Sequence, residues 1–330
     1  MHNGHDHAPP TVMVCVYGKP KKKKTSDAIA AFPNGLFIGV PSAIALVANN
    51  ELGIQPAIHP SPPQTLPELV QMLEQLSANP ETLKPYGALI IDDASHICKR
   101  SMLMWAEEAP TGRSGRKDRF FQYQQLNSHL LQLAGLSRHL GVHLAMTFHE
   151  RPPGSNADGV FCPGGPDVPS RNQTETLPSW CDINVRSMVD PTYPDPWFPS
   201  VYYCDPTDSE WVTGDRTGVC TEKTPGNLRE IMNASASGYK LDRFPGLEWQ
   251  DEVAEEVASQ IILGRSSRDV ATEVMKKHNQ YSQVHLRWAC QDGIARGVLR
   301  AQQQKGLFDF DSAESRVSES SSLPPPPPVR

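Results

Sequence analysis

Hydrophobic residues in the first half of the chain gather into short runs, and stretches with helical spacing separate those runs. Buried strands are predicted for the apolar runs at residues 12–17, 36–40, 87–93 and 141–150. Helices are predicted by the spacing at residues 26–32, 65–76 and 119–139. Strands that are apolar along their whole length are typical of a parallel sheet with both faces covered. The alternation predicts an α/β fold with a doubly wound, mostly parallel sheet and right-handed crossovers.

The second half of the chain has a different pattern. Residues 151–200 are rich in proline and glycine, which predicts long loops with short strands, and residues 201–221 predict two antiparallel strands around a turn. Three helical segments follow, at residues 252–263, 266–278 and 281–304. We therefore expect a flexible tail, a main domain, a helical appendage and a disordered or polyproline Ser/Pro-rich tail, at residues 1–10, 11–250, 251–305 and 306–330.

Composition narrows the class of protein. The 330 residues carry a net charge of −6, so the chain is not basic throughout, and any contact with nucleic acid must be local. No run approaches the roughly 18 apolar residues needed to cross a bilayer, and the N-terminus lacks the order of a secretion signal, so we expect no membrane contact. The seven cysteines form no C-x-x-C pair, which argues against a zinc site and favours reduced, intracellular thiols.

The segment after the first predicted strand follows the frame of a phosphate-binding loop, G-x-x-x-x-G-K-[ST], between a strand and a helix. Three residues match the frame, and Lys23 stands where the frame has its second glycine. Such a loop wraps a phosphate chain with backbone N–H groups at the positive end of the following helix. The expected nucleotide-binding residues are Gly18, Lys19, Pro20, Lys21, Lys22, Lys23, Lys24 and Thr25.

The lysines of this loop have opposite effects on the prediction. A left-handed backbone at Lys23 would cost roughly 1–2 kcal/mol, and its side chain would crowd the phosphates. Five lysines between residues 19 and 24 nevertheless provide a dense positive field for an anion. Two alternatives stay open: a loop that binds nucleotide without hydrolysing it, and a short basic segment that acts as a nuclear-import signal or a general polyanion patch.

Two carboxylates end the predicted strand at residues 87–93. Asp92 is expected to hold Mg²⁺ through water while the Thr25 hydroxyl binds the metal directly, so Thr25 and Asp92 are the candidate metal ligands. Asp93 is a candidate to orient or deprotonate the attacking water. The alternative is that both acids merely cap a core strand. The phosphate-binding frame upstream favours the functional interpretation.

Two further residues are candidates for the chemistry. His149 and Glu150 end the strand predicted at residues 141–150, where a polar residue can touch a γ-phosphate and sense its loss, and the alternative is a satisfied histidine at a strand edge. Arg216 lies in a tight turn after Trp211, from which an arginine would reach the phosphate of a neighbouring subunit or pair with Asp215. The expected catalytic residues are therefore Asp93, His149 and Arg216.

The loop, the acid-ended strand, the M-T-F-H-E strand end and the G-D-R-T-G turn together resemble the RecA-like P-loop NTPases of tailed bacteriophages over residues 11–225. The resemblance implies ATP and Mg²⁺, with Lys24 on the β/γ-phosphates and His149 as sensor. It also implies self-assembly with nucleotide near a subunit boundary, and action with single-stranded DNA and phage recombination or replication proteins in the host cytoplasm. An alternative is a non-catalytic P-loop component of the virion.

Two departures from that family bear on hydrolysis. Lys21 and Lys23 replace small residues of the loop, so the Walker A motif is degenerate. The strand at residues 36–40 ends without the acid that RecA-like enzymes often carry there, and Glu51 is the nearest acid beyond it. Activity as an ATPase is therefore uncertain from the sequence.

The C-terminal helices have the layout of a helix-turn-helix, and their cations suggest a grip on DNA phosphates. These cations are Arg265, Arg268, Lys276, Lys277, Arg287, Arg296 and Arg300. The alternative is an ordinary helical appendage that packs on the core or on a partner through its apolar residues. These apolar residues are Val270, Val274, Val284, Trp288 and Ile294.

Overall fold

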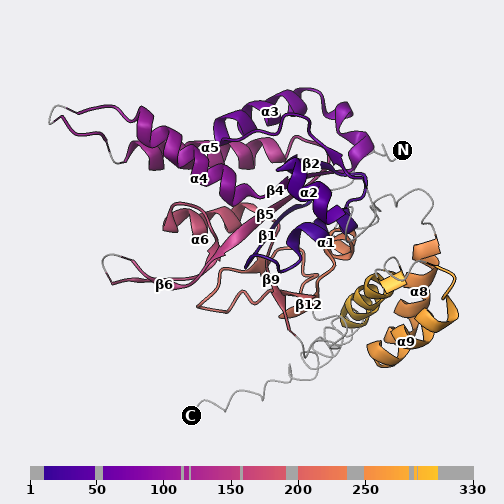
Figure 1. Ribbon diagram of the computed structural model, residues 1–330. Helices are drawn as coiled ribbons and strands as arrows, with labels where there is room; N and C mark the ends of the chain where they lie inside the picture. The colour runs from indigo at the N-terminus through magenta and orange to yellow at the C-terminus, as the bar shows by residue number, and fades with distance from the viewer. Residues whose placement is uncertain are drawn as a thin grey trace, which may run out of the picture.

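A twisted, mostly parallel sheet forms the centre of the main domain in the computed structural model (Figure 1). The structure describes residues 11–48, 55–112, 115–118, 120–156, 159–190, 200–235, 249–281, 286–287 and 289–303. The parallel strands are β1 (Met13–Gly18), β2 (Leu36–Gly39), β3 (Ala57–Ile58), β4 (Ala88–Asp92), β5 (His143–Arg151) and β9 (Ile183–Val189). Their order across the sheet is β9-β1-β5-β4-β2-β3, so β1 lies between β5 and β9.

Antiparallel additions extend this sheet on the β9 side and at the end of β5. The additions are β8 (Gly165–Pro166), β10 (Ser200–Tyr203), β11 (Gly214–Asp215) and β12 (Lys223–Pro225). A separate two-stranded hairpin consists of β6 (Gly154–Ser155) and β7 (Phe161–Cys162). Figure 1 shows this hairpin and the α4–α5 connection projecting to the same side of the molecule.

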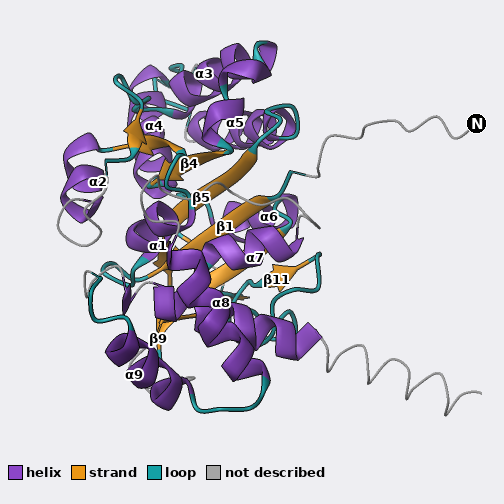
Figure 2. Cartoon of the chain, turned by 90° about the vertical axis from the view of Figure 1, so that its right-hand side faces the viewer, coloured by secondary structure: helices purple, strands orange, loops and turns teal. Residues whose placement is uncertain are grey.

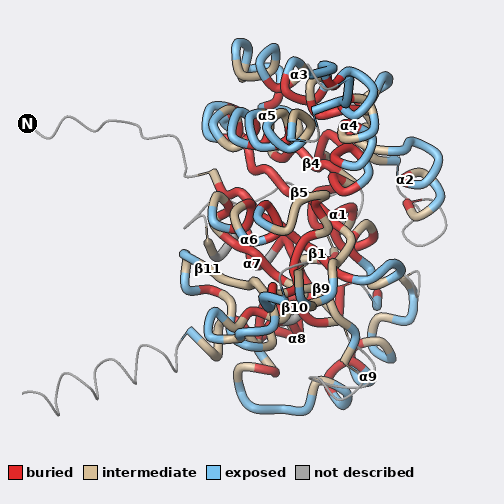
Figure 3. Tube along the Cα trace, turned by 90° about the vertical axis from the view of Figure 1, so that its left-hand side faces the viewer, coloured by how far each residue is buried: buried red, intermediate tan, exposed pale blue. Residues whose placement is uncertain are grey.

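Helices cover both faces of the sheet because strand side chains alternate between two apolar cores. One core receives Met13, Cys15 and Tyr17 of β1, and the other receives Val14 and Val16. The first core is covered by α3 (Leu66–Ala78), α4 (Ala94–Glu108), α5 (Phe121–Ser137) and α6 (Arg171–Trp180). The second is covered by α1 (Lys24–Ala31), α2 (Pro41–Val47) and α7 (Leu228–Ser235). Short 3-10 turns at Pro80–Thr82 and Lys84–Tyr86 lead into β4. The buried strands run through the middle of Figure 3, with exposed helix surfaces outside them.

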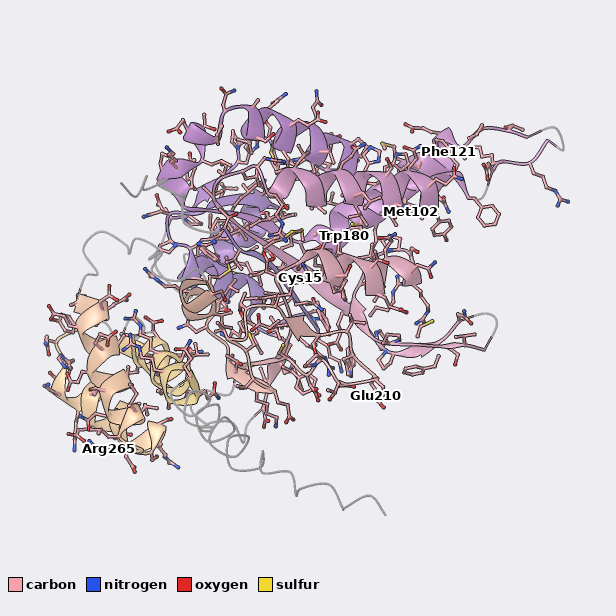
Figure 4. The ribbon with its side chains drawn as sticks, turned by 180° about the vertical axis from the view of Figure 1, so that it is seen from behind. Cys15, Met102, Phe121, Trp180, Glu210 and Arg265 are labelled. Atoms are coloured by element: carbon pink, nitrogen blue, oxygen red, sulfur yellow. The ribbon has the colours of Figure 1, made fainter. Side chains whose placement is uncertain are left out.

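The C-terminal helices form a bundle with an apolar core of its own. It consists of α8 (Trp249–Ile262), α9 (Ser267–Lys277) and a last helix that includes residues 286–287 and 289–303. The last helix crosses α8 closely: a Cβ on Gly293 would lie 2.4 Å from the Ala254 carbonyl oxygen. Figure 4 shows this bundle, which carries Arg265, beside the sheet domain, which carries Cys15.

The expected fold class, α/β with a doubly wound, mostly parallel sheet and a helical appendage, is confirmed. Two local predictions were wrong. Residues 151–200 contain α6 and the seven-residue strand β9, and not only loops with short strands. Within residues 201–221, β11 pairs with β9 and not with β10, whose antiparallel partners are β9 and β12. The expected tails at residues 1–10 and 306–330 lie outside the described residues.

Candidate functional site

The phosphate-binding frame folds into a loop between β1 and α1, at the carboxyl end of the parallel strands. Gly18 ends β1 beside β9, where a Cβ would lie 2.5 Å from the Ser187 carbonyl oxygen. A larger residue would push the two strands apart, so the close packing of β1 against β9 requires the first glycine of the frame. The Ser187 hydroxyl also donates a hydrogen bond to the Lys22 carbonyl at 2.7 Å. Strand β9 therefore fixes both the start and the middle of the loop.

Two lysines of the loop take the left-handed backbone that glycine adopts at little cost. Lys21 has φ 62° and Lys23 has φ 66°, and these are the non-glycine residues with positive φ in the described part of the chain. Each left-handed residue costs roughly 1–2 kcal/mol. The loop thus has glycine-like backbone angles at two lysines. Lys23 is the N-cap of α1 and gives the helix no side-chain hydrogen bond. The first N–H groups of a helix lack intrahelical acceptors, so they are able to donate hydrogen bonds to a phosphate.

The Lys24 ammonium is folded back into the loop. Its Nζ donates to the Gly18 and Lys19 carbonyl oxygens at 2.9 Å each, and the residue is 9% exposed. Burial lowers the pKa of Lys24, and the nearby carboxylates of Asp92, Asp93 and Glu150 oppose that shift. A cation that only backbone carbonyls hold is well placed to exchange them for phosphate oxygens.

Asp92 lies at the end of β4, and β5 separates that strand from β1. Two hydroxyls bridge the gap. Thr25 Oγ1 donates to Asp92 Oδ2 at 2.9 Å, and Thr147 Oγ1 donates to Asp92 Oδ1. Burial raises the pKa of Asp92, and both hydroxyl bonds oppose the rise. On the other side of β4 only glycine fits opposite Asp92, because a Cβ on Gly39 would lie 1.8 Å from the Asp92 carbonyl oxygen.

The donor set around Asp92 suits Mg²⁺. A hydroxyl and a carboxylate supply oxygen ligands, which this ion prefers, and Mg²⁺ commonly completes its shell with water and phosphate oxygens. In the described part of the chain, no group of three or more His, Cys, Asp or Glu residues is arranged to hold a metal.

Asp93 and His149 lie side by side next to this pair. His149 Nε2 is 3.2 Å from Asp93 Oδ2, and the His149 side chain is 39% exposed. Asp93 also caps α4, because its Oδ1 accepts the His96 N–H at 2.6 Å. The His149 N–H donates to Ser95 Oγ at 3.0 Å. Asp93 thus caps a helix and not the core strand, and its carboxylate lies close enough to the loop to act on the pKa of Lys24. The peptide bond between Asp92 and Asp93 is cis.

Within one chain, Arg216 lies at the end of the parallel strands that is opposite to the phosphate-binding loop. Its N–H donates to the Asp182 carbonyl at 2.9 Å, and its guanidinium donates to the Ser179 carbonyl. The Asp182 carboxylate accepts the N–H of Met13, which begins β1, whereas the loop follows the end of β1. Asp215 accepts from Thr217 and Cys220. A role for Arg216 toward a neighbouring subunit stays a prediction.

The structure brings one more charged pair to the loop end of the parallel strands, and the sequence analysis did not single this pair out. Arg186, opposite Tyr17 in the β1–β9 register, donates from Nε to Glu150 Oε2 at 3.0 Å. Its guanidinium lies 3.4 Å from the centre of the Trp211 ring. Glu150 was visible as the polar end of a strand, but Arg186 was hidden in a segment predicted as loop. The pair fixes the ends of β5 and β9 beside the loop.

Most cations that suggested a DNA grip in the C-terminal helices are paired with acids inside the bundle. The pairs are Arg265–Glu273, Lys277–Glu256, Arg296 with Asp251, Glu255 and Asp292, and Arg300–Glu255. Among the apolar residues, Val270, Val274 and Ile294 are buried in the bundle core, whereas Val284 and Trp288 lie outside the described residues, as does Glu51. This favours packing over phosphate binding, and DNA binding by the bundle stays a prediction.

Comparisons with known proteins add little to this geometry. No protein family model matches the chain, and no curated protein matches it. Solved structures do match, among them the RadB recombinase, at 13% sequence identity and a TM-score of 0.32 over 54% of this chain and 75% of that one. A likeness this distant carries no information on activity. Among the described residues, no helix combines the length and apolar character needed to cross a membrane.

Proposed function

We propose that the chain binds Mg-ATP at the loop between β1 and α1 as a RecA-like P-loop protein. The observation that supports this most strongly is the 2.9 Å hydrogen bond from the Thr25 hydroxyl to the Asp92 carboxylate. These residues are 67 positions apart in the sequence, and the Lys24 ammonium lies in the same loop as Thr25. A phosphate-binding loop needs this combination of a cation, a hydroxyl and an acid at one strand edge.

Each side chain has a defined task in this proposal. Lys24 exchanges its two carbonyl partners for β- and γ-phosphate oxygens, and the N–H groups at the start of α1 donate to the same phosphates. Thr25 and Asp92 hold Mg²⁺, which neutralises phosphate charge when it is bound. Thr147 orients the Asp92 carboxylate through its hydroxyl. The binding energy comes from groups that the fold brings together at one end of the parallel strands.

Hydrolysis would use Asp93 and His149. Asp93 accepts a proton from the attacking water or orients it, and His149, 3.2 Å from Asp93, contacts the γ-phosphate. The left-handed lysines favour the second candidate function, a non-catalytic P-loop protein with a structural or assembly role, because they strain the loop and their long side chains would crowd bound phosphates. In the wider proposal the chain self-assembles, with Arg216 reaching a neighbour's site, and acts with single-stranded DNA in phage recombination or replication.

Fluorescent ATP analogues test binding directly. We expect Mg²⁺-dependent binding that Lys24→Ala weakens at least tenfold, because the ammonium is the central phosphate ligand. Lys276→Ala removes the same charge from the exposed surface of α9 and is the matched control. Equal affinity of the two variants would contradict the proposed site.

ATP hydrolysis with and without single-stranded DNA separates the two candidate functions. Hydrolysis that Lys24→Ala abolishes supports the enzyme, and stimulation by single-stranded DNA supports the role in recombination or replication. Binding without turnover, together with turnover in a Lys21→Gly/Lys23→Gly variant, supports the non-catalytic protein. For that protein, detection in purified phage particles tests the role in the virion.

A further inference from the structure

Helix α7 lies between the loop helix α1 and the C-terminal bundle (Figure 2). Three apolar residues of α7, Leu228, Ile231 and Met232, are buried in the same core as Ala28 and Ile29 of α1. Leu299 of the last helix is buried in that core as well, although most apolar side chains of the last helix face the bundle core. The loop helix and the bundle therefore share packing through α7.

Asp27 connects α1 to the start of α7. It is the third residue after Lys24, in the first turn of α1, and it is buried. Both of its carboxylate oxygens accept the N–H of Leu228, the first residue of α7, at 3.3 Å. Burial raises the pKa of Asp27, and the nearby Asp292 carboxylate adds to the rise. A residue that lies one turn from the proposed phosphate ligands thus caps a helix of another part of the fold.

A chain of polar contacts continues from α7 into the bundle. Asn227, just before α7, donates to Asp292 Oδ1 on the last helix at 2.5 Å. The second oxygen of Asp292 accepts from Arg296 at 2.7 Å. Arg296 in turn donates to Asp251 at 2.9 Å and to Glu255 at 3.1 Å, both on α8. Asn227 and Arg296 are buried and Asp292 is largely so, which limits the screening of the contacts among these three, whereas Asp251 and Glu255 are about half exposed.

We propose that this series of contacts couples occupancy of the phosphate-binding loop to the stability of the C-terminal bundle. The inference rests on the proposed function, since it takes Mg-ATP as the ligand. Lys23, the left-handed N-cap of α1, gives the first turn of that helix no side-chain hydrogen bond. Phosphate oxygens that accept the N–H groups of the first turn hold that turn, and Asp27 with it. The hydrogen bond from the Leu228 N–H to Asp27 is then broken less often, and local unfolding of the last helix becomes less frequent.

Linkage makes the coupling reciprocal. If Mg-ATP stabilises the bundle, any ligand or change that stabilises the bundle must raise the affinity for Mg-ATP by the same factor. The bundle is therefore the place where a partner would control nucleotide binding. A bundle that was merely appended, without communication with the loop, would show neither effect.

Hydrogen exchange of the full chain, with and without Mg-ATP, tests the coupling. We expect slower exchange at residues 18–31 and, in the same sample, exchange slowed by roughly fivefold or more at residues 228–235 and 289–303. Asp292→Asn leaves one acceptor oxygen for two donors, so the contact from Asn227 or the contact from Arg296 is lost and the series is broken at the last helix. It should keep the protection at residues 18–31 and lose it at residues 289–303.

Glu256→Gln is the matched control. Glu256 holds Lys277 and His278 within the bundle and takes no part in the contacts that lead to the loop. This variant should show the protection of the natural chain at residues 289–303. Loss of that protection in Glu256→Gln and Asp292→Asn alike would overturn the specific route.

The outcomes separate the coupling from the function on which it rests. Protection at residues 18–31 without any change at residues 228–235 and 289–303 overturns the coupling and leaves nucleotide binding intact. Absence of protection at residues 18–31 overturns both. Asp27→Ala, which removes the acceptor of the Leu228 N–H, should speed exchange in α7 and the last helix when measured without nucleotide, and unchanged exchange would refute the contacts as a link whatever the ligand.

Discussion

Replacing the two left-handed lysines with glycine should leave the folded chain as stable as the natural one or stabilise it. Lys21 and Lys23 have φ 62° and 66°, a conformation in which Cβ crowds the backbone. Glycine removes that crowding, so each substitution relieves strain in the native state. The same substitution at Lys22, which lies between them without a positive φ, relieves nothing. The three positions lose the same charge, which makes Lys22→Gly a matched control.

The magnitude follows from two opposing effects. A left-handed backbone costs a residue other than glycine roughly 1–2 kcal/mol, which each glycine recovers. Glycine loses more conformational freedom on folding, at a cost of roughly 0.5–1 kcal/mol. The free energy of unfolding should therefore change by about 0 to +1.5 kcal/mol at Lys21 and at Lys23. At Lys22 it should fall by about 0.5–1 kcal/mol, because only the entropic cost remains.

Urea unfolding of the natural chain and the three single variants measures this difference without nucleotide. The expected order of stability places Lys21→Gly and Lys23→Gly at or above the natural chain and Lys22→Gly below it. The Lys22 carbonyl that accepts the Ser187 hydroxyl is retained in all of them, so the anchor to β9 is constant. If Lys23→Gly lost as much stability as Lys22→Gly, the loop would not have the backbone described, and the explanation of its degenerate motif would be wrong.

Three further predictions concern the groups around the site. Because burial raises the pKa of Asp92, protons compete with Mg²⁺ at higher pH than at an ordinary aspartate, and Mg²⁺-dependent nucleotide binding, followed by titration, should weaken as the pH falls through that raised value. Thr147→Val removes the hydroxyl bond to the Asp92 carboxylate and should lower the free energy of unfolding in urea by about 1.5–3 kcal/mol and weaken Mg²⁺ binding. Burial lowers the pKa of His143 from 6.5 to about 4, so its folded form resists protonation, and up to about 3 kcal/mol of stability should be lost as the pH falls from 6.5 towards 4. His143→Asn, whose amide oxygen replaces the ring nitrogen that accepts the Val12 N–H, should show a smaller loss between pH 7 and pH 5, and an equal loss would contradict this cause.

The sequence predicted the strands around the site because each contains a largely apolar run. Strands β1, β4 and β5 are buried on both faces, and each ends where a polar residue begins. Parallel strands of this kind bring their carboxyl ends to one edge, so their pattern together with the phosphate-binding frame predicted that Thr25 lies near Asp92. Local spacing could not reveal that β5 lies between β1 and β4. The contact from Thr147 to Asp92 depends on that order and was missed for this reason.

Strand β9 was missed because its sequence mixes polar and apolar residues without clean alternation. Ile183 and Val185 are buried, but so are Asn184 and Ser187, whose hydrogen bonds lead to a backbone carbonyl of a distant loop and to the phosphate-binding loop itself. Polar residues that are buried because they fix loops look like loop residues in a sequence. The same error hid Arg186, which only the parallel pairing of β9 with β1 brings to the site.

The lysines that replace glycine give the loop a dependence on anions that a glycine-rich loop would lack. Without phosphate, five neighbouring lysines repel one another, and two of them hold a strained backbone. A bound polyphosphate offsets both effects, since it neutralises the lysines and accepts the N–H groups of the strained turn. Salt screens the repulsion but leaves the backbone strain unchanged. Added salt should therefore stabilise the empty loop only in part, whereas polyphosphate stabilises it further at equal ionic strength. Because Asp27 follows this turn directly and caps α7, the same anion dependence extends into the C-terminal bundle.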